Sequence, residues 1–212
     1  MLVATVIGSG IMAERLAGGN VALVLLGNTL ATGAMLIVLV LMLGPISGAH
    51  LNPAVSAVSA LRRALTVRDC VSYIAAQLTG AIVGVLLAHA MFDLPIPQVS
   101  HNARVGLGQW LGEFVATFGL VGTILCTAGR RPSSTAYAVG LYVAAAYWFT
   151  SSTSFANPAV TVARSLSDTF AGIDPMNVPA FIAAQLAGAL GASLFFGWLL
   201  QARTDDRVSA SH

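Results

Sequence analysis

The sequence contains the triplet Asn-Pro-Ala twice, as Asn52-Pro53-Ala54 and as Asn157-Pro158-Ala159. Asn is favoured at a helix N-cap and Pro at the first helical position, so each triplet is expected to open a helix. If the two helix starts meet, two side-chain amides and the positive ends of two helix dipoles converge at one point. Such a point repels cations and can hold small hydroxyl compounds by hydrogen bonds. The triplets therefore predict the middle of a pore for uncharged solutes.

The composition predicts that this pore lies in a lipid bilayer. Hydrophobic residues make up 57% of the 212 residues and charged residues only 8%, whereas a soluble domain is about 25% charged. Six apolar stretches lie near 3–27, 31–48, 69–91, 107–128, 135–151 and 177–201. A helix of roughly 20 residues crosses a bilayer core of about 30 Å. We expect an all-α membrane protein with six transmembrane helices, and we expect no nucleic-acid partner because no dense basic run is present.

An internal repeat divides the chain into two halves. The segment 73–80 recurs as 181–188, and Glu14 and Glu113 form a second matched pair, whose offset differs from that of the triplets only by loop length. Because each half contains an odd number of spans, the halves must insert in opposite directions, giving an inverted three-helix repeat. We predict a single channel domain over 1–202, with repeat one at about 1–92 and repeat two at about 107–202. A polar cytoplasmic tail, 203–212, is expected to follow.

Each triplet opens a stretch too short to cross the membrane. The expected helices end near Leu61 and Ser165, and about ten residues span only about 15 Å, half the hydrocarbon thickness. Two re-entrant half-helices that meet near the midplane follow from these lengths. The unwound backbone before each triplet, at 48–51 and 153–156, must face protein or a water-filled lumen, because lipid cannot satisfy its carbonyls.

Three polar residues are candidates for holding this unwound backbone. Glu14 and Glu113 are expected to lie inside spans, where a carboxylate needs a polar partner, and we expect each to tie down the loop of its own half. A proton-relay role is the alternative. His50 is expected to brace the first loop, with a place at the inner mouth of the pore as the alternative. No metal site, cofactor site or catalytic nucleophile is expected, so the chain is not predicted to be an enzyme.

The distribution of arginines predicts the orientation. If the amino terminus is cytoplasmic, the outer connections carry only Arg104 and Arg164. The inner connections and the tail then carry Arg62, Arg63, Arg68, Arg130, Arg131, Arg203 and Arg207. By the positive-inside rule, both termini are expected in the cytoplasm.

Over nearly its full length the chain resembles the aquaporin and aquaglyceroporin family. The resemblance rests on the segment Ile46-Ser47-Gly48-Ala49-His50-Leu51-Asn52-Pro53-Ala54-Val55, on the second triplet and on the paired glutamates. It implies the aquaporin fold and a homotetramer in which each protomer has its own pore. It also implies a multi-pass location in the cell membrane, here a bacterial inner membrane.

Members of this family usually carry an outer selectivity filter built from an aromatic residue, often a His, a small residue and an Arg after the second triplet. Counted without gaps from the two asparagines, its positions fall on Thr32, Ala145, Ser154 and Val160. None of these is aromatic or charged, so we expect a wider opening and weaker selection against solutes larger than water.

The segment 154–164 is similar to that of bacterial aquaglyceroporins associated with arsenic resistance, which also have Val in place of the filter Arg. The resemblance implies passive transport of arsenite as the uncharged trihydroxide, along with glycerol and water. Two alternatives remain open. One is a water and glycerol channel without an arsenic role, and the other is an ion-coupled secondary transporter.

Arg164 could supply some of the missing charge. It follows Val160 by four residues, so it lies on the same helix face about 6 Å further out. One interpretation places its side chain in the outer vestibule of the pore. The other has it extend to the membrane interface.

Overall fold

The computed structural model is all-α in the part that it describes, which comprises residues 1–96 and 98–209, with side chains as far as 201. No strand occurs in these ranges, as the sequence predicts. The helices are α1 (Leu2–Leu16), α2 (Val21–Ser47), α3 (Pro53–Leu61), α4 (Val67–Met91), α5 (Leu107–Thr127), α6 (Pro132–Phe149), α7 (Pro158–Arg164), the 3-10 helix η1 (Pro175–Asn177) and α8 (Val178–Ser209).

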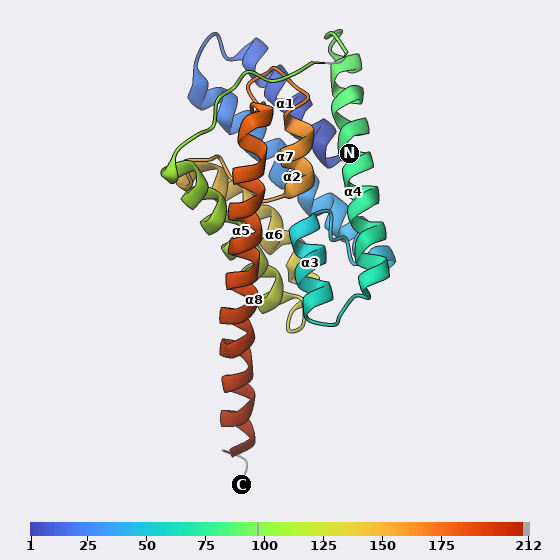
Figure 1. Ribbon diagram of the computed structural model, residues 1–212, viewed down its shortest axis with the longest axis vertical. Helices are drawn as coiled ribbons and strands as arrows, with labels where there is room; N and C mark the ends of the chain where they lie inside the picture. Colours follow the sequence, from blue (N-terminus) through green and yellow to red (C-terminus); the bar gives the residue numbers. More distant parts are fainter. Residues whose placement is uncertain (97, 210–212) are drawn as a thin grey trace.

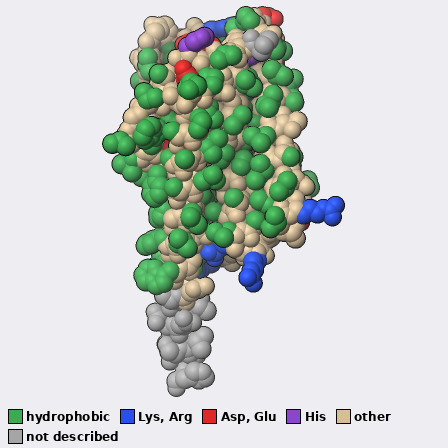
Figure 2. Space-filling model, viewed as in Figure 1, with side chains coloured by type: hydrophobic (Ala, Val, Ile, Leu, Met, Phe, Trp, Pro, Cys, Tyr) green, Lys and Arg blue, Asp and Glu red, His purple; other side chains and the backbone are tan. Residues whose placement is uncertain are grey.

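Two short helices, α3 and α7, lie between the long helices α4 and α8. α7 occupies the upper half of the molecule in Figure 1 and α3 the lower half, and the two contact each other between them. Around them α1 packs on α2 and α4, α2 on α6, and α5 on α6 and α8. Figure 2 shows hydrophobic side chains over the flank of the molecule, with most charged and histidine side chains towards its two ends. This is the surface of a protein whose solvent is lipid.

Four segments are long and apolar enough to cross a bilayer in the described residues: Val21–Ser47, Val67–Met91, Leu107–Thr127 and Pro175–Gln201. α6 has 18 residues and α1 has 15, so α1 reaches only about 22 Å at the usual rise. α8 continues to Ser209 and extends beyond the other helices (Figure 1). Most of the predicted polar tail is thus a continuation of this helix, and residues 210–212 lie outside the described residues.

The predicted boundary between the first two spans is wrong. An unbroken span over 3–27 was expected, but α1 ends at Leu16 and a turn follows at 17–20. Gly18 and Gly19 have φ angles of 55° and 86°, which favour glycine. Asn20 then caps α2, since its side chain accepts hydrogen bonds from the first backbone N–H groups of that helix at 3.0 and 3.3 Å. Glu14 therefore lies in the last turn of α1, and its side chain is exposed.

Gly188 marks a close crossing between α8 and α5. A Cβ atom at Gly188 would collide with the backbone carbonyl of Phe114, and such overpacking typically costs about 1–3 kcal/mol. Gly188→Ala is expected to lower the melting temperature of the protein in detergent. Gly80 is its counterpart in the internal repeat and has no atom within 4 Å of an added Cβ, so Gly80→Ala is the matched control. Equal melting temperatures for the two variants would contradict this account of the crossing.

Candidate pore and selectivity site

The two triplets meet through a pair of crossed hydrogen bonds. Asn52 caps α3 with its Oδ1, which accepts from an N–H of the same helix at 2.9 Å, while its Nδ2 donates to the carbonyl of Ala156 at 2.7 Å. Asn157 does the same for α7, and its Nδ2 donates to the carbonyl of Leu51 at 2.8 Å. Each asparagine therefore caps its own half-helix and holds the loop of the other. The remaining hydrogen of each amide is not needed for these contacts.

The loops ahead of the triplets have an unusual backbone. Five non-glycine residues have φ between 48° and 60°: Ala49, Leu51, Thr153, Ser154 and Ala156. This region costs free energy for residues with a side chain and persists only where the surroundings enforce it. It follows that these loops need strong anchors.

Glu113 is the anchor of the second loop. Its side chain is fully buried. The backbone N–H groups of Phe155 and Ala156 donate to its two carboxylate oxygens at 2.8 and 2.9 Å, and Gln185 donates at 2.5 Å. Hydrogen bonds to a charged acceptor are the strong ones in proteins. These contacts fix the loop that precedes Asn157 against α5 and α8.

The two halves share a second anchor. Gln185 also donates to the hydroxyl of Thr161, four residues after the second pore asparagine, at 2.8 Å. In the first half Gln77 donates at 3.0 Å to Ser56, which occupies the same position after the first. The recurrence of 73–80 as 181–188 thus appears in three dimensions as a repeated link between a long helix and a half-helix.

The predicted role of Glu14 is wrong. Glu14 is exposed near the carboxyl end of α1 and borders a hollow with Arg15 and Asp168. We call it the outer hollow, because the predicted orientation places it outside. Within the described residues no carboxylate accepts a hydrogen bond from the first loop. That loop is held instead by His50, whose Nδ1 lies 3.2 Å from the hydroxyl of Ser56. His50 also borders the pore cavity. It therefore contacts both the first half-helix and the cavity, and the two interpretations of this residue are compatible with each other.

A cavity of about 60 Å³ surrounds the asparagines. Its wall contains both asparagines and three of the four predicted filter residues, namely Thr32, Ser154 and Val160. The hydroxyls of Thr32 and Ser154 are buried and have no partner within the described residues, so they can bond to a molecule in the cavity. The rest of the wall is mostly apolar and includes Leu2, Val6, Leu36, Val40, Val55, Leu120, Ile124, Val143 and Tyr147.

Ala145 was placed in the filter wrongly, and Tyr147 was missed. Ala145 is exposed on the outside of α6, whereas Val143 and Tyr147 border the cavity. Counting without gaps fixes the position only if the connection before the triplet has the expected length. Residues four apart share a helix face, and a residue two further along points to the other side. Helix phase starting from Val143 would have identified Tyr147, which adds an aromatic ring to the pore.

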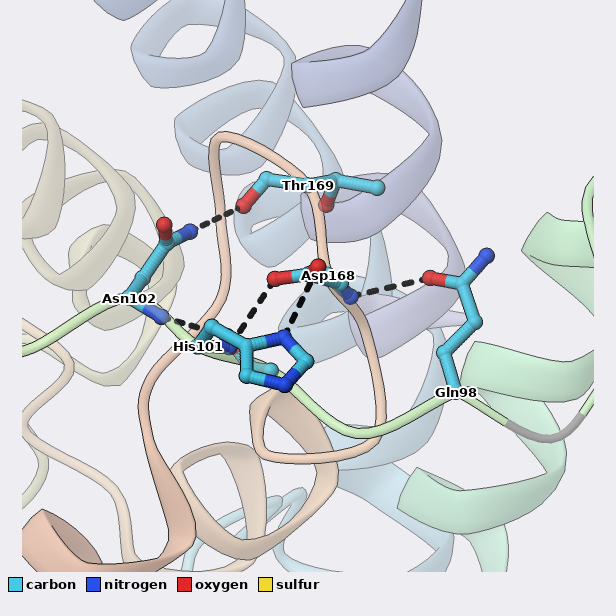
Figure 3. A network of polar contacts seen from close by, with 6 residues as sticks. Gln98, His101, Asn102, Asp168 and Thr169 are labelled. Atoms are coloured by element: carbon cyan, nitrogen blue, oxygen red, sulfur yellow. Dashed lines mark hydrogen bonds and ion pairs between the residues drawn. The ribbon is translucent and has the colours of Figure 1, made fainter.

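At the end of the molecule that the predicted orientation places outside, two connections are bonded to each other (Figure 3). Asp168, in the segment after α7, accepts from the backbone N–H of His101 at 2.9 Å and lies 3.1 Å from its Nδ1. Hydrogen bonds from His101 hold the pKa of Asp168 below its usual value. Asn102 donates to the carbonyl of Thr169 at 2.6 Å, and Gln98 accepts from the N–H of Asp168 at 2.9 Å.

The segment that follows α7 is also bonded to α4. The buried His89 of α4 lies 2.9 Å from the hydroxyl of Ser167. The chain just after α7 is thus fixed between α4 and the outer connection 92–106. No local sequence pattern predicts these contacts, because they join residues about 70 positions apart.

Arg164 is neither in the vestibule wall nor at the interface. Only 1% of its surface is exposed, so the interpretation that it extends to the membrane interface is wrong. Its guanidinium lies over the ring of Phe155, 3.3 Å from the centroid, and its Nε donates to the carbonyl of Ala171. It borders neither the pore cavity nor the outer hollow. Its charge therefore sits behind the pore wall.

Arg104, from the outer connection, approaches the same ring. Its guanidinium carbon is 4.9 Å from the centroid of Phe155, and its Nε donates to the carbonyl of Gly172 at 2.8 Å. Burial lowers the pKa of Arg104, while the Glu113 carboxylate and the Tyr147 hydroxyl raise it. An arginine in such surroundings keeps its charge at neutral pH.

The sequence of this chain is similar to those of known proteins. Residues 1–150 match the family model of the major intrinsic proteins. The chain is 56% identical over 201 residues to aquaglyceroporin AqpS of Rhizobium meliloti (strain 1021), covering 95% of this chain and 86% of that protein. It is 31% identical over 188 residues to aquaporin-1 of Ovis aries, covering 84% and 68%.

A solved structure shares the fold. The aquaglyceroporin from Plasmodium falciparum superposes with a TM-score of 0.65 at 22% identity, covering 93% of this chain and 90% of that one. With two half-helices joined tip to tip between long helices, and with these relatives, the chain belongs to the major intrinsic protein family.

Proposed function

We propose that this protein is a passive channel for water, glycerol and other small uncharged solutes, among them arsenite. The observation that carries the proposal is the pair of crossed asparagines in the wall of a cavity between two half-helices. Their amides lie where two positive helix ends converge, which favours neutral molecules that accept and donate hydrogen bonds.

The wall of the cavity suits a compact polyol. One side offers the amides of Asn52 and Asn157 and the free hydroxyls of Thr32 and Ser154, and the remainder is largely apolar. Glycerol presents hydroxyls and a hydrocarbon backbone, so it can contact both kinds of surface. Similarity to a protein named an aquaglyceroporin supports this choice. Arsenite, as the uncharged trihydroxide, presents three hydroxyls to the same groups.

Stopped-flow light scattering of vesicles containing the purified protein tests the proposal. Water, glycerol and arsenite are each expected to equilibrate at least about tenfold faster than across protein-free vesicles, with rates linear in solute concentration. If water and glycerol pass but arsenite does not, the arsenite assignment is wrong and the general channel stands. Saturable uptake that depends on an ion gradient would favour a secondary transporter instead.

One feature already weighs against ion coupling. A coupled transporter needs a titratable group in the solute path. Glu113, a buried carboxylate close to the pore, has its oxygens engaged by two backbone N–H groups and Gln185. It borders neither the cavity nor the outer hollow. Its contacts are those of a loop anchor.

Assembly and location complete the proposal. We expect a homotetramer in a bacterial inner membrane with both termini on the cytoplasmic side. Arg15 adds a third arginine to the outer side, since it borders the outer hollow with Arg104. The inner connections still hold five: Arg62, Arg63, Arg68, Arg130 and Arg131. This excess supports the expected orientation.

A further inference from the structure

Two guanidinium groups share one aromatic ring beside the pore. Arg104 and Arg164 lie 4.9 and 3.3 Å from the centroid of Phe155. Their hydrogen bonds go to carbonyls: Arg104 donates to Gly172, Phe170 and Ser152, and Arg164 to Ala171. In the ranges with described side chains, the ion pair His101–Asp168 is the one recorded. Neither arginine has a carboxylate within salt-bridge distance.

The ring joins these charges to the pore wall. Phe155 stands between Ser154 and Ala156 in the second re-entrant loop, and all three border the cavity around the asparagines. Phe155 also packs against Ile173 and Phe181, and its ring lies 5.2 Å from that of Phe181. The two positive charges therefore lie directly behind the wall, one residue layer from the solute path.

The burial of Arg164 is incompletely compensated. Its Nη1 is buried and has no hydrogen-bond partner within the described residues. A buried unsatisfied group of this kind costs stability, more so when it is charged, and needs an explanation. Glu113 is the nearby negative charge, but its oxygens are already engaged by three donors. Two positive charges against one leave an excess positive charge at this part of the pore.

We infer that Arg104 and Arg164 exclude cations from the pore by their field, acting through the wall at Phe155. The inference rests on the proposed channel function and adds to it which residues select by charge. Val160 and Thr32 leave the lumen open and uncharged, and Tyr147 narrows it with a ring. Residues that line the lumen then select solutes by size, while the two arginines select them by charge. The electric field of a charge in a low-dielectric wall reaches the lumen even though its side chain does not.

Charge-removing and charge-keeping variants test this inference. Arg104→Gln and Arg164→Gln are each expected to raise the passive K⁺ and H⁺ leak of protein-containing vesicles by about tenfold, the order expected when one nearby charge is lost in a medium of low dielectric. Water and glycerol rates should stay within about twofold of the unmodified protein. Arg104→Lys keeps the positive charge but loses the forked geometry of the guanidinium, and its K⁺ and H⁺ leak should equal that of the unmodified protein.

The control is Arg15→Gln, which removes an exposed outer arginine that donates to the carbonyl of Phe92. Its leak should not change. An unchanged leak in Arg104→Gln overturns the inference, and so does a leak in Arg104→Lys as large as in Arg104→Gln, since the arginine would then act only as a clamp. If the unmodified protein passes no neutral solute, the proposed channel function fails separately.

Discussion

Glu113→Gln is expected to reduce glycerol and water flux by more than about tenfold and to lower the yield of folded protein. The carboxylate accepts backbone N–H groups on both oxygens, from Phe155 and Ala156. An amide presents one acceptor and one donor, so one backbone N–H would face another N–H. A hydrogen bond to a charged group contributes about 1.5–3 kcal/mol. The strained loop before Asn157 would lose its main anchor.

Glu14→Gln is the matched control, because Glu14 is the residue that the sequence pairs with Glu113, and its side chain is exposed in the structure. Flux and thermal unfolding in detergent are measured for both variants. Glu14→Gln should match the unmodified protein in both. A Glu113→Gln protein with normal flux would show that the loop holds its shape without the carboxylate, contrary to the account above.

Val160→Trp is expected to nearly abolish glycerol flux and to reduce water flux by at least about tenfold. Val160 borders the cavity of about 60 Å³, and an indole ring is larger than the space that the isopropyl group leaves. Val160 lies in the first turn of α7, where the half-helix has nowhere to retreat because its cap is bonded to the opposite loop. The lumen should therefore be blocked while the fold is kept.

Ala145→Trp tests the helix phase of α6 in the same assay. Ala145 is on the exposed face of this helix and does not border the pore cavity, so a tryptophan at this position lies outside the lumen. Its flux should equal that of the unmodified protein. If Ala145→Trp blocks the channel and Val160→Trp does not, the pore has been placed on the wrong side of α6.

The features that the sequence predicted correctly are those fixed by local rules. Asn at an N-cap followed by Pro forces a helix start, and the structure ends α3 at Leu61 and α7 at Arg164, close to the predicted ends. The odd number of spans per half predicted two half-helices entering from opposite sides. Their contact at Asn52 and Asn157 follows from length alone, since two helices of half the membrane thickness can meet only in the middle.

Two of the predictions that were wrong are the first span, which rested on average hydropathy, and the role of Glu14, which rested on its spacing from Glu113. Hydropathy averaged over 3–27 concealed Gly18, Gly19 and Asn20, although these three residues are a turn signal. Glu14 lies 99 positions before Glu113, while the triplets are separated by 105 and the repeated helix segment by 108. That smaller spacing indicated that Glu14 is not the counterpart of Glu113.

Other features could not be obtained from the sequence. Arg164 shares a helix face with Val160, but whether its side chain is in the lumen or behind it depends on Phe155, Ala171 and Arg104, which reach it from other segments. The link from His89 to Ser167 joins α4 to the segment that follows α7. Such contacts are set by tertiary packing and leave no local pattern.

The crossed bonds between the asparagines and the opposite loops also limit how the protein can move. Rocking one half of the molecule against the other, as in alternating access, would have to break the bonds from Asn52 to Ala156 and from Asn157 to Leu51 together. Both half-helix tips would lose a partner at a buried point of the structure. Each amide is therefore held in one orientation, and the crossed bonds oppose a conformational cycle between one passage and the next.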